Sequence, residues 1–393
     1  MKIFMIHPHD LFDFSEPWTI RIKSLASRFK SKGHEVKIAY FPLRASHAYP
    51  PQSQWQGIPV ITLDRRRGLN YLFKNTLKLY NEIKWADIVH FQKCFHYASI
   101  PAILASWLAK KPLHYDWDDW ETKIYFYGKP ASPIIGIYMW ILERAIPKFV
   151  DSVSLSSKRL LELATKEYGV AKDRTTMAPV GADCERFSPH NSGEEIRKKY
   201  RIDGPIVLYL GQLHGAQYAE LFIQSAEIVA RWHPSTMFFI VGGGYRLQEL
   251  KTLAYRLGMA DKIIFTGFVS HDETWKYIAA ADVCVACFEN NDITQCKSPL
   301  KLAEYLASGK AIVASNVGEV RNMVGGVGIL VEPGNHVVLA GAINELLFRP
   351  DLRAKMGIIA RKRALEKYNW TWTADNLLQT YFRVMKGYEL RRK

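Results

Sequence analysis

The sequence predicts an α/β protein with two Rossmann-like domains, each built on a doubly wound parallel sheet. The chain has 393 residues, which is enough for two or three domains. Its first part alternates strand and helix, because Lys2–Ile6 predicts a strand, Trp18–Lys32 a helix and Val36–Tyr40 the next strand. A second series of short apolar runs begins at Ile206–Leu210, after the polar stretch at residues 190–193 that predicts a linker.

The composition is that of a globular protein with a basic surface. Apolar residues make up 48% of the chain, charged residues 23%, and the net charge is +15. Charge alone favours nucleic acid, an anionic membrane or a phosphate-bearing small molecule as a partner. Nucleic acid is the weakest of the three, because the sequence has no RNA-binding motif, zinc finger or heptad array. Five cysteines without a dense framework favour a reducing, cytoplasmic compartment.

No segment predicts a signal peptide or a membrane span. Met1–Ile6 is too short for the apolar core of a signal peptide. The longest apolar segment, Pro133–Val150, is interrupted by three charged residues and predicts an amphipathic helix that is either packed in the core or faces a membrane. The basic and aromatic run Arg65–Lys74 is either a solvated charge run or a contact with anionic lipid or an acidic acceptor. Peripheral contact with the inner face of a membrane is therefore an expectation.

Polar and aromatic residues follow several strands of the first part. Ligands bind at the carboxyl ends of parallel strands, so side chains placed there are candidates for a binding site. For a histidine at such a position, a packed imidazole or a helix cap is an equally good interpretation. The candidates for the acceptor side are His7, Trp18, His90, Asp118 and Asp119.

The most informative stretch, Ser298–Ser315, predicts a loop, a helix, a tight stop and a buried strand. Ser298 is expected to cap the helix, and Pro299 fits its first position. Gly309 can adopt the left-handed conformation that ends a helix, and Ala311–Ala314 is a short apolar run typical of a strand buried on both faces. A helix N-terminus fed by a loop is an anion site by geometry.

One carboxylate on this helix, Glu304, lies at the edge of its apolar arc. Lys301, Tyr305 and Ser308 are expected to face away from the arc. Glu304 is then either a surface carboxylate paired with Lys301 at i,i+3 or a carboxylate that binds a ligand. The spacing alone leaves both interpretations open.

Residues Pro299–Gly309 and Ala311–Ser315 resemble the signature of the family 4 glycosyltransferases, which are retaining enzymes of the GT-B fold. The resemblance implies two Rossmann-like domains that face a central cleft, the second binding a nucleotide sugar and the first an acceptor. In this family the glutamate equivalent to Glu304 binds the ribose hydroxyls of the donor. Ala178–Pro189 resembles the segment that closes the first domain, and Tyr368–Trp372 the segment that crosses back to it.

The implied domains are residues 1–190, with a C-terminal helix at 373–393 packing back on them, and residues 191–372. The implied reaction transfers a sugar, with retention, from a nucleotide sugar to a glycan, lipid-linked or polysaccharide-precursor acceptor, without a metal or other cofactor. The resemblance assigns catalytic roles to His90, Lys301 and Glu304. It assigns the donor contacts to Gly211, Gln212, Gly243, Gly267, Phe268, Lys297, Ser298, Pro299, Leu300 and Glu304.

Two short motifs could indicate metal chemistry. Asp116 and Asp118 form the D-x-D pattern with which GT-A transferases hold Mn²⁺ or Mg²⁺. The pattern is common, and a loop lining the acceptor site is favoured over it. Cys284 and Cys287 form a C-x-x-C on a predicted strand, where residues three apart point to opposite faces, so a metal or redox role is not expected.

The sequence also departs from the family pattern. Gln212 stands where the usual arginine binds the donor pyrophosphate, and no lysine occurs from Leu213 to Ala230. Cys296 stands where the family often has a first glutamate. Lys297 or Lys301 is then expected to supply the missing charge. The departures keep two alternatives open: a GT-B sugar-nucleotide epimerase or hydrolase, and a non-catalytic glycosyltransferase-like assembly protein.

Overall fold

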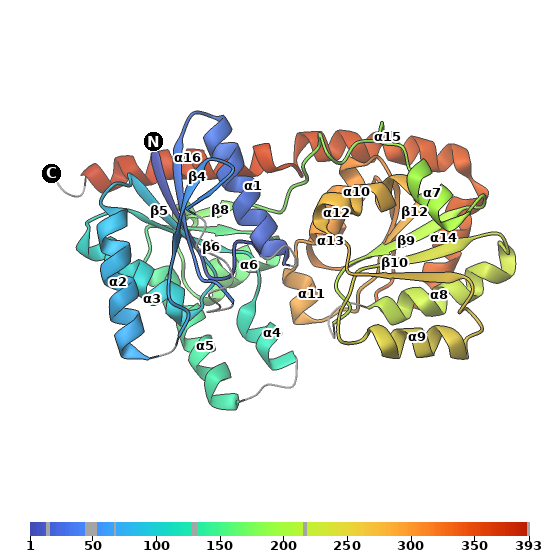
Figure 1. Cartoon of the computed structure of the whole chain (residues 1–393), viewed down its shortest axis with the longest axis horizontal. Helices are drawn as coiled ribbons and strands as arrows, with labels where there is room; N and C mark the ends of the chain where they lie inside the picture. Colours follow the sequence, from blue (N-terminus) through green and yellow to red (C-terminus); the bar gives the residue numbers. More distant parts are fainter. Residues whose placement is uncertain (13–15, 44–52, 67, 128–131, 215–217, 391–393) are drawn as a thin grey trace. The chain divides into compact units, whose positions relative to one another are not determined.

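The structure is a computed structural model that describes residues 1–12, 16–43, 53–66, 68–127, 132–214 and 218–390. It divides into two compact units, each with its own sheet (Figure 1). Unit 1 comprises Met1–Pro179 and Thr373–Lys393, and unit 2 comprises Val180–Trp372. Arg67, Gly215 and Arg391–Lys393, which belong to segments considered above, lie outside the described residues.

Unit 1 is built on an eight-stranded sheet with the order β3-β4-β2-β1-β5-β6-β7-β8. All neighbouring strands are parallel except β3 and β4. Its strands are β1 (Lys2–His7), β2 (Glu35–Tyr40), β3 (Gln54–Trp55), β4 (Ile58–Thr62), β5 (Ile88–Gln92), β6 (Leu113–Trp117), β7 (Ser152–Leu155) and β8 (Thr175–Met177). Its helices are α1 (Pro17–Ser31), α2 (Leu69–Ile83), α3 (His96–Leu108), α4 (Glu121–Tyr127), α5 (Pro133–Ala145), α6 (Lys158–Glu162) and most of α16 (Trp370–Leu390).

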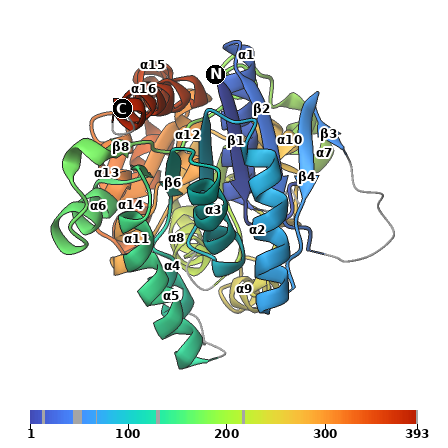
Figure 2. The same ribbon diagram turned by 90° about the vertical axis from the view of Figure 1, so that its left-hand side faces the viewer.

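Helices cover both faces of this sheet. Helices α2 and α3 lie over one face (Figure 2). On the other face α1 and α16 contact the strands through polar side chains, since Arg21 binds Asp116 and Tyr381 binds His90. The central strands β5 and β6 are buried along their whole length, as expected for parallel strands covered on both sides.

Unit 2 is built on a six-stranded sheet with the order β11-β10-β9-β12-β13-β14, and every pair is parallel. This order reverses between β9 and β12, which is the doubly wound topology expected from the sequence. The strands are β9 (Ile206–Leu210), β10 (Met237–Val241), β11 (Ile263–Gly267), β12 (Val283–Ala286), β13 (Ala311–Ser315) and β14 (Ile329–Val331). The helices are α7 (Glu194–Tyr200), α8 (Ala219–Trp232), α9 (Leu247–Arg256), α10 (His271–Ala280), α11 (Asp292–Cys296), α12 (Leu300–Ala307), α13 (Gly318–Val324), α14 (His336–Phe348) and α15 (Pro350–Glu366).

The first boundary between the units lies between Pro179 and Val180, earlier than residue 190. The segment from Val180 onward is tied to unit 2 by hydrogen bonds. The amide of Val180 donates to the hydroxyl of Ser298, and the guanidinium of Arg361 donates to the carbonyl oxygens of Cys184 and Phe187. Residues 180–189 therefore belong to the second unit although they precede the polar run at 190–193.

Candidate active site

Three strand ends of unit 2 meet in glycine-rich turns. A Cβ atom on Gly242 would lie 2.0 Å from the carbonyl oxygen of Gly211, and one on Gly244 would lie 2.3 Å from that of Leu213. The turns after β9 and β10 therefore pack backbone against backbone, which only glycine allows. A Cβ on Gly243 would lie 3.3 Å from the amide nitrogen of Phe268, which follows β11. These turns thus form one continuous edge at the carboxyl end of the sheet.

The helix that carries Glu304 begins differently from the prediction. Helix α12 starts at Leu300, and Pro299 precedes it in an extended conformation as the capping residue. The prediction that Ser298 caps this helix is wrong, because the hydroxyl of Ser298 instead accepts a hydrogen bond from the backbone amide of Val180 at 3.2 Å. The predicted stop is confirmed, since Gly309 has a φ of +61° and β13 follows.

The face of α12 that was expected to point away from its apolar arc is buried as well. Lys301, Tyr305 and Ser308 are all buried. The hydroxyl of Tyr305 accepts a hydrogen bond from the backbone amide of Leu210 at 2.9 Å. The reason is that α12 packs against α13, α15, β12 and β13, so it is enclosed on all sides. Helical periodicity predicts which residues share a face but does not show how many other elements cover the helix.

Glu304 is a buried carboxylate held by a histidine. Its side chain is 3% exposed, and its Oε1 lies 2.6 Å from Nε2 of His271, the first residue of α10. The His271 ring lies 5.7 Å from that of Phe187. The interpretation of Glu304 as a solvated surface carboxylate is therefore excluded. Sequence reasoning missed His271, which lies four residues beyond Gly267, one of the predicted donor contacts.

Lys301 lies beside this carboxylate in an aromatic setting. Its Nζ is 4.3 Å from the centre of the Tyr209 ring and 5.6 Å from that of Phe288. The pKa of Lys301 is lowered to about 7, mainly by burial; the charge of Lys297 acts in the same direction, while Cys287 and Glu304 oppose the shift. A bound anion would restore the charged form, so this lysine is suited to an anionic ligand.

In unit 1 the carboxyl edge of the sheet holds an acidic cluster around one lysine. Nζ of Lys93 lies 2.8 Å from Asp118, 2.8 Å from Asp119 and 2.5 Å from Glu121. Burial raises the pKa of Glu121 to about 8 and that of Asp118 to about 6, although the Lys93 charge opposes both shifts. The three carboxylates are close enough together to hold a metal ion, but the ammonium group occupies the position between them. Lys93, which has a φ of +64°, was not among the predicted residues.

The predicted acceptor-side residues His7 and Trp18 lie next to this cluster. The Trp18 ring is 5.1 Å from Nζ of Lys93 and 5.6 Å from the ring of His7. Both ring nitrogens of His7 are engaged, with Gln92 at 2.9 Å and Thr19 at 3.1 Å, and burial lowers its pKa to about 3. The structure therefore brings His7, Trp18, Asp118 and Asp119 together, with His7 as a neutral, fully buried member.

His90 lies within the packed interior of unit 1, a position that favours a packed imidazole over the predicted catalytic role. Its side chain is fully buried inside β5, and its Nδ1 lies 2.6 Å from the hydroxyl of Tyr381 on α16. It stacks on His114 at 5.3 Å, and burial lowers its pKa to about 4. The alternate pointing of strand residues places it under the helix layer, and the packed imidazole is the favoured interpretation.

Asp116 belongs to the same buried network and not to a metal site. Both of its carboxylate oxygens accept hydrogen bonds from Arg21 at 2.7 Å, and Ser154 donates to it at 2.5 Å. Burial raises the pKa of Asp116, but the Arg21 charge outweighs this effect and holds the pKa well below its usual range. Asp116 and Asp118 therefore have different partners, so the D-x-D pattern does not form a shared metal site among them. Cys284 and Cys287 are both buried free thiols.

Two family models match the chain in succession. The model described as Glycosyltransferase Family 4 matches residues 19–186, and the model described as Glycosyl transferases group 1 matches residues 192–363. The first match covers most of unit 1 and the second most of unit 2. The departures at residues 212 and 296 both lie within the second match, so they do not remove the similarity of that half.

Curated relatives share about a quarter to a third of aligned residues. The alpha-D-kanosaminyltransferase of Streptomyces kanamyceticus is 28% identical over 249 residues, which are 62% of this chain and 63% of that protein. The GDP-mannose-dependent alpha-(1-6)-phosphatidylinositol monomannoside mannosyltransferase of Mycobacterium tuberculosis is 29% identical over 240 residues, 60% of this chain and 62% of that protein. The chain thus aligns with somewhat less than two thirds of the length of these relatives.

Solved structures match the fold over nearly the whole chain. Sucrose-phosphate synthase from Thermosynechococcus elongatus gives a TM-score of 0.77 at 21% identity, covering 98% of this chain and 99% of that one. Anabaena HepE in complex with UDP-glucose gives 0.74 at 17% identity, covering 97% and 99%. At these identities the likeness concerns the fold alone, and it confirms the expected GT-B class of two Rossmann-like domains.

Proposed function

The chain belongs to the family 4 glycosyltransferases, and from this we propose that it transfers a sugar, with retention of configuration, from a nucleotide sugar to an acceptor. The proposed acceptor is a glycan, a lipid-linked sugar or a polysaccharide precursor. Relatives with sugar-transferring names support the activity, and one of them is named for a phosphatidylinositol-linked acceptor. Two solved structures of Anabaena HepE are named as complexes, one with UDP and glucose and one with UDP-glucose.

The observation that carries the proposal is the buried carboxylate of Glu304. An unpaired carboxylate costs little free energy when water surrounds it. A buried carboxylate destabilises the protein unless it is hydrogen-bonded. Here His271 binds Oε1 at 2.6 Å, which orients the carboxylate. We propose that Glu304 accepts hydrogen bonds from the ribose hydroxyls of the donor, as its place in the family motif implies.

Lys301 and Lys297 are proposed to replace the usual pyrophosphate-binding pair. Since burial brings the pKa of Lys301 to about 7, its ammonium form is stabilised by an arriving diphosphate. The backbone turns at Gly211, Gly243 and Gly267, with Gln212 and Phe268, are proposed to contact the nucleotide, with Ser298, Pro299 and Leu300 at the start of α12. Positioning and stabilisation of the leaving diphosphate then supply the catalysis, and the donor phosphate takes the acceptor proton on the same face of the sugar.

The acceptor is proposed to bind at the carboxyl edge of the unit 1 sheet. Trp18 offers an apolar face, and Asp118 and Asp119 offer hydrogen-bond acceptors for sugar hydroxyls. Lys93 compensates their charge, so the reaction is proposed to need no metal ion at this cluster. His7 supports Trp18 from beneath.

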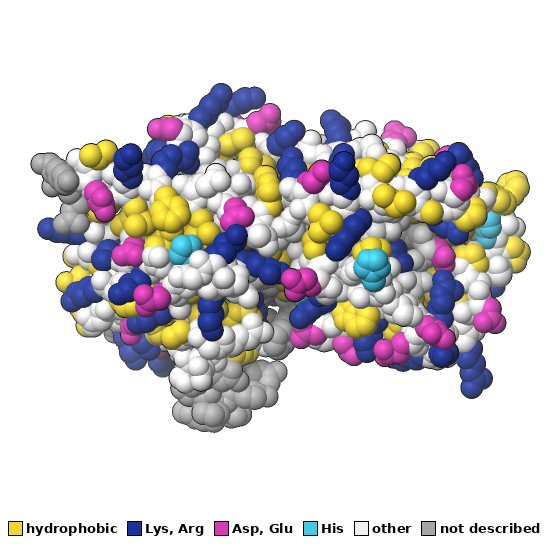
Figure 3. All heavy atoms as spheres, turned by 90° about the horizontal axis from the view of Figure 1, so that it is seen from above, with side chains coloured by type: hydrophobic (Ala, Val, Ile, Leu, Met, Phe, Trp, Pro, Cys, Tyr) yellow, Lys and Arg dark blue, Asp and Glu magenta, His cyan; other side chains and the backbone are white. Residues whose placement is uncertain are grey.

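We also propose that the protein works in the cytoplasm at the inner face of a membrane. Within the described residues, no helix is both long and apolar enough to cross a bilayer. On the face drawn in Figure 3, Lys and Arg side chains are scattered among Asp and Glu and are not gathered in one stripe. The net charge of +15 favours a partner with an anionic surface, and the absence of a nucleic-acid-binding motif from the sequence favours a membrane over nucleic acid.

The test is a thermal-shift panel of UDP-, GDP- and ADP-sugars on the full chain, with Glu304→Gln as the variant. A ligand that binds only the native state raises the melting temperature. We expect one nucleotide class to stabilise the protein and Glu304→Gln to lose that shift. Glu319→Gln is the matched control, because Glu319 is an equally buried carboxylate of unit 2 on α13.

Two outcomes would contradict the proposal. If no sugar nucleotide raises the melting temperature at millimolar concentration, the chain is a non-catalytic relative. If a sugar nucleotide binds and is consumed at the same rate with and without any acceptor, the protein is a hydrolase or epimerase. An unchanged shift in Glu304→Gln would remove Glu304 from the donor site while leaving the activity itself standing.

A further inference from the structure

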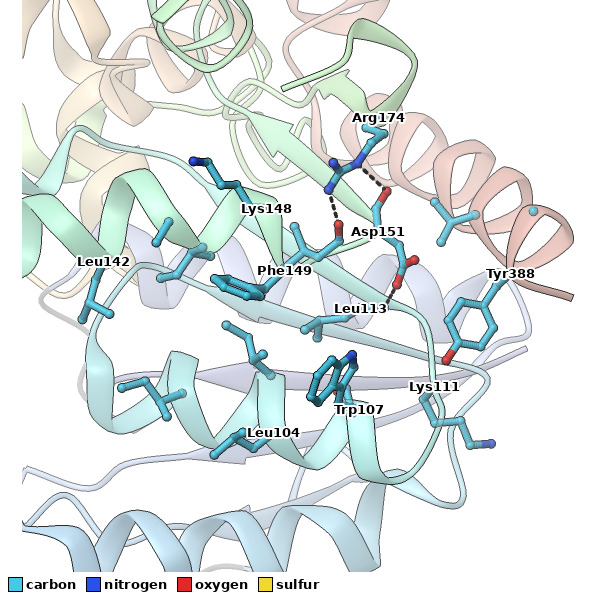
Figure 4. A pocket seen from close by; sticks show the side chains of 18 of the residues that line it. Leu104, Trp107, Lys111, Leu113, Leu142, Lys148, Phe149, Asp151, Arg174 and Tyr388 are labelled. Atoms are coloured by element: carbon cyan, nitrogen blue, oxygen red, sulfur yellow. Dashed lines mark hydrogen bonds between the residues drawn. The ribbon is translucent and has the colours of Figure 1, made fainter. Parts of the chain in front are cut away.

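Unit 1 carries a large apolar groove that the proposed reaction does not use. Its volume is about 900 Å³, at the upper end of the range for ligand sites. Helices α3, α5 and α16 and the turn at Ile146–Lys148 form its walls. Figure 4 shows Leu104 and Trp107 on α3 on one side of the groove, with Leu142 and Phe149 across from them.

The groove lies at the edge of the unit 1 sheet opposite to the edge that holds the Lys93 cluster. Leu113 is the first residue of β6, Asp151 immediately precedes β7, and Arg174 immediately precedes β8. All three residues line the groove, so it is at the amino ends of these strands. Since ligands of doubly wound sheets bind at the carboxyl ends, a molecule in the groove is not the reacting acceptor.

The apolar surface around the groove is unusually exposed. Trp107 is 79% exposed and Phe149 is 61% exposed, and Leu108 extends the patch along α3. Helix α5 buries only Gly136 and Glu143, so most of its apolar side chains face outward. The exposed apolar residues of this helix are Ile134, Ile135, Ile137, Tyr138, Trp140 and Ile141. Apolar patches of this kind mark sites of contact with a partner or a membrane.

A buried carboxylate holds α5 in this orientation. Glu143 accepts hydrogen bonds from the indole of Trp117 at 3.2 Å, from the Glu121 amide at 2.9 Å and from the hydroxyl of Thr122 at 2.5 Å. Near its middle, α5 also meets α3, where the rings of His96 and Tyr138 are 5.6 Å apart. The outward apolar face of α5 is therefore fixed by specific contacts on its inner side.

The charges at the groove favour an anionic occupant. Its lining includes four cationic side chains and two carboxylates. Lys111 and Lys148 extend away from the apolar side chains toward the rim (Figure 4). A second copy of the chain is disfavoured as the occupant, because each copy carries a net charge of +15. Apolar walls with a basic rim match a hydrocarbon chain joined to a phosphate.

We propose that this groove holds one hydrocarbon chain of an anionic phospholipid, with the lipid phosphate at the basic rim beside one of the two lysines, Lys111 or Lys148, that lie at its opposite ends, and that this edge of unit 1 thereby attaches the protein to an anionic bilayer. The inference rests on the proposed function for its membrane setting and adds the site and the lipid chemistry. Its test contains no sugar nucleotide, so its failure and the failure of the proposed function are separate results.

The groove can be blocked at Gly387, which lines it from α16. A Cβ at Gly387 would have no atom within 4 Å, so Gly387→Phe fills the groove without a clash at its base. Replacing a helical glycine also favours the helix, so the variant is expected to fold. Gly341→Phe is the matched control, because Gly341 is a helical glycine of unit 2 that likewise has no atom within 4 Å. Trp107→Glu tests the apolar patch, with the similarly exposed Ile358→Glu on α15 as its control.

The first measurement is sedimentation of the full chain with vesicles of phosphatidylcholine and with an equimolar mixture of phosphatidylcholine and phosphatidylglycerol. We expect binding to the mixed vesicles only, weakened about tenfold or more by Trp107→Glu and Gly387→Phe and unchanged in the two controls. Equal binding to both kinds of vesicle, or wild-type binding by both groove variants, would overturn the proposal.

The second measurement separates the chain in the groove from general contact with a bilayer. Dihexanoyl-phosphatidylglycerol below its micelle-forming concentration should raise the melting temperature of the wild type and of Gly341→Phe, but not of Gly387→Phe. Glycerol 3-phosphate, which offers the phosphate without a hydrocarbon chain, should have no effect. If the short-chain lipid fails to stabilise the wild type, or stabilises Gly387→Phe equally, the groove does not hold a lipid chain.

Discussion

Replacing Arg21 by methionine should destabilise unit 1 strongly. Arg21 and Asp116 are joined by two hydrogen bonds of 2.7 Å, and their side chains are 1% and 0% exposed. The substitution leaves a carboxylate buried without its cation, which typically costs about 3–5 kcal/mol. Ser154 and Gln92 still donate to Asp116, so a value near the lower limit, about 3 kcal/mol, is expected.

The loss should depend on pH. In the wild type the pKa of Asp116 is held below its ordinary value, so its contribution to stability is complete above about pH 4 and is lost only as the pH falls through that depressed pKa. In Arg21→Met burial acts without compensation and raises the pKa of this carboxyl. Protonation then relieves the buried charge, and the destabilisation should be smaller at pH 5 than at pH 8.

The assay is urea denaturation followed by circular dichroism at both pH values, using the transition of unit 1. The double variant Arg21→Met/Asp116→Asn, which removes both charges, should be less destabilised than Arg21→Met alone. Arg66→Met is the control, because Arg66 pairs with Asp64 in comparable geometry on the surface and should change stability very little. A loss below about 1 kcal/mol, or an equal loss at both pH values, would refute the reasoning.

Three further results are expected. Gly244→Ala should lower the melting temperature, because the new Cβ would lie 2.3 Å from the carbonyl oxygen of Leu213. Gly341→Ala should leave the melting temperature unchanged, because a Cβ at Gly341 has no atom within 4 Å. Equal effects of the two substitutions would contradict the role of close packing at the turn. Lys93→Met should acquire stabilisation by millimolar Ca²⁺ that the wild type lacks, because the three carboxylates around it are then uncompensated; thermal shifts with and without the ion would decide this. Nucleotide affinity measured by calorimetry should fall as the pH rises above about 7, because the lowered pKa of Lys301 then leaves it neutral, and a flat profile from pH 6 to pH 9 would exclude it from phosphate binding.

Strand and helix order could be predicted from the sequence because apolar runs and turn residues act locally. The strand at Ala311–Ala314 and the glycine stop at Gly309 were both expected, and the structure contains them. Local signals were weaker for helix starts. Serine is a residue type typical of helix caps, but the hydroxyl of Ser298 accepts a hydrogen bond from the amide of Val180 instead. Because Val180 is far away in the chain, local sequence patterns could not predict this contact.

Which polar side chains meet was decided by the tertiary structure. His90 and Asp118 were both predicted at a ligand-binding edge, but only Asp118 lies there, beside Lys93, whereas His90 lies beneath α16. The partner of Glu304 was also hidden, since a motif on one helix carries no information about His271 on another. Such pairs bring together residues from separate elements, and their positions depend on how the layers pack.

Periodicity, turn residues and the Ser298–Ser315 stretch depend only on neighbours along the chain, so the sequence was enough to predict two doubly wound domains, whose sheets are parallel except for the β3–β4 pair. The compensation of charges in the interior depends on the tertiary structure. The ion pairs of Arg21 with Asp116 and of Lys93 with its carboxylates join residues from different elements. The tertiary structure also decided which apolar residues remain outside. The sequence left open whether the apolar residues of Pro133–Val150 pack in the core or face outward, and the packing of α5 through its buried Glu143 leaves most of them outside.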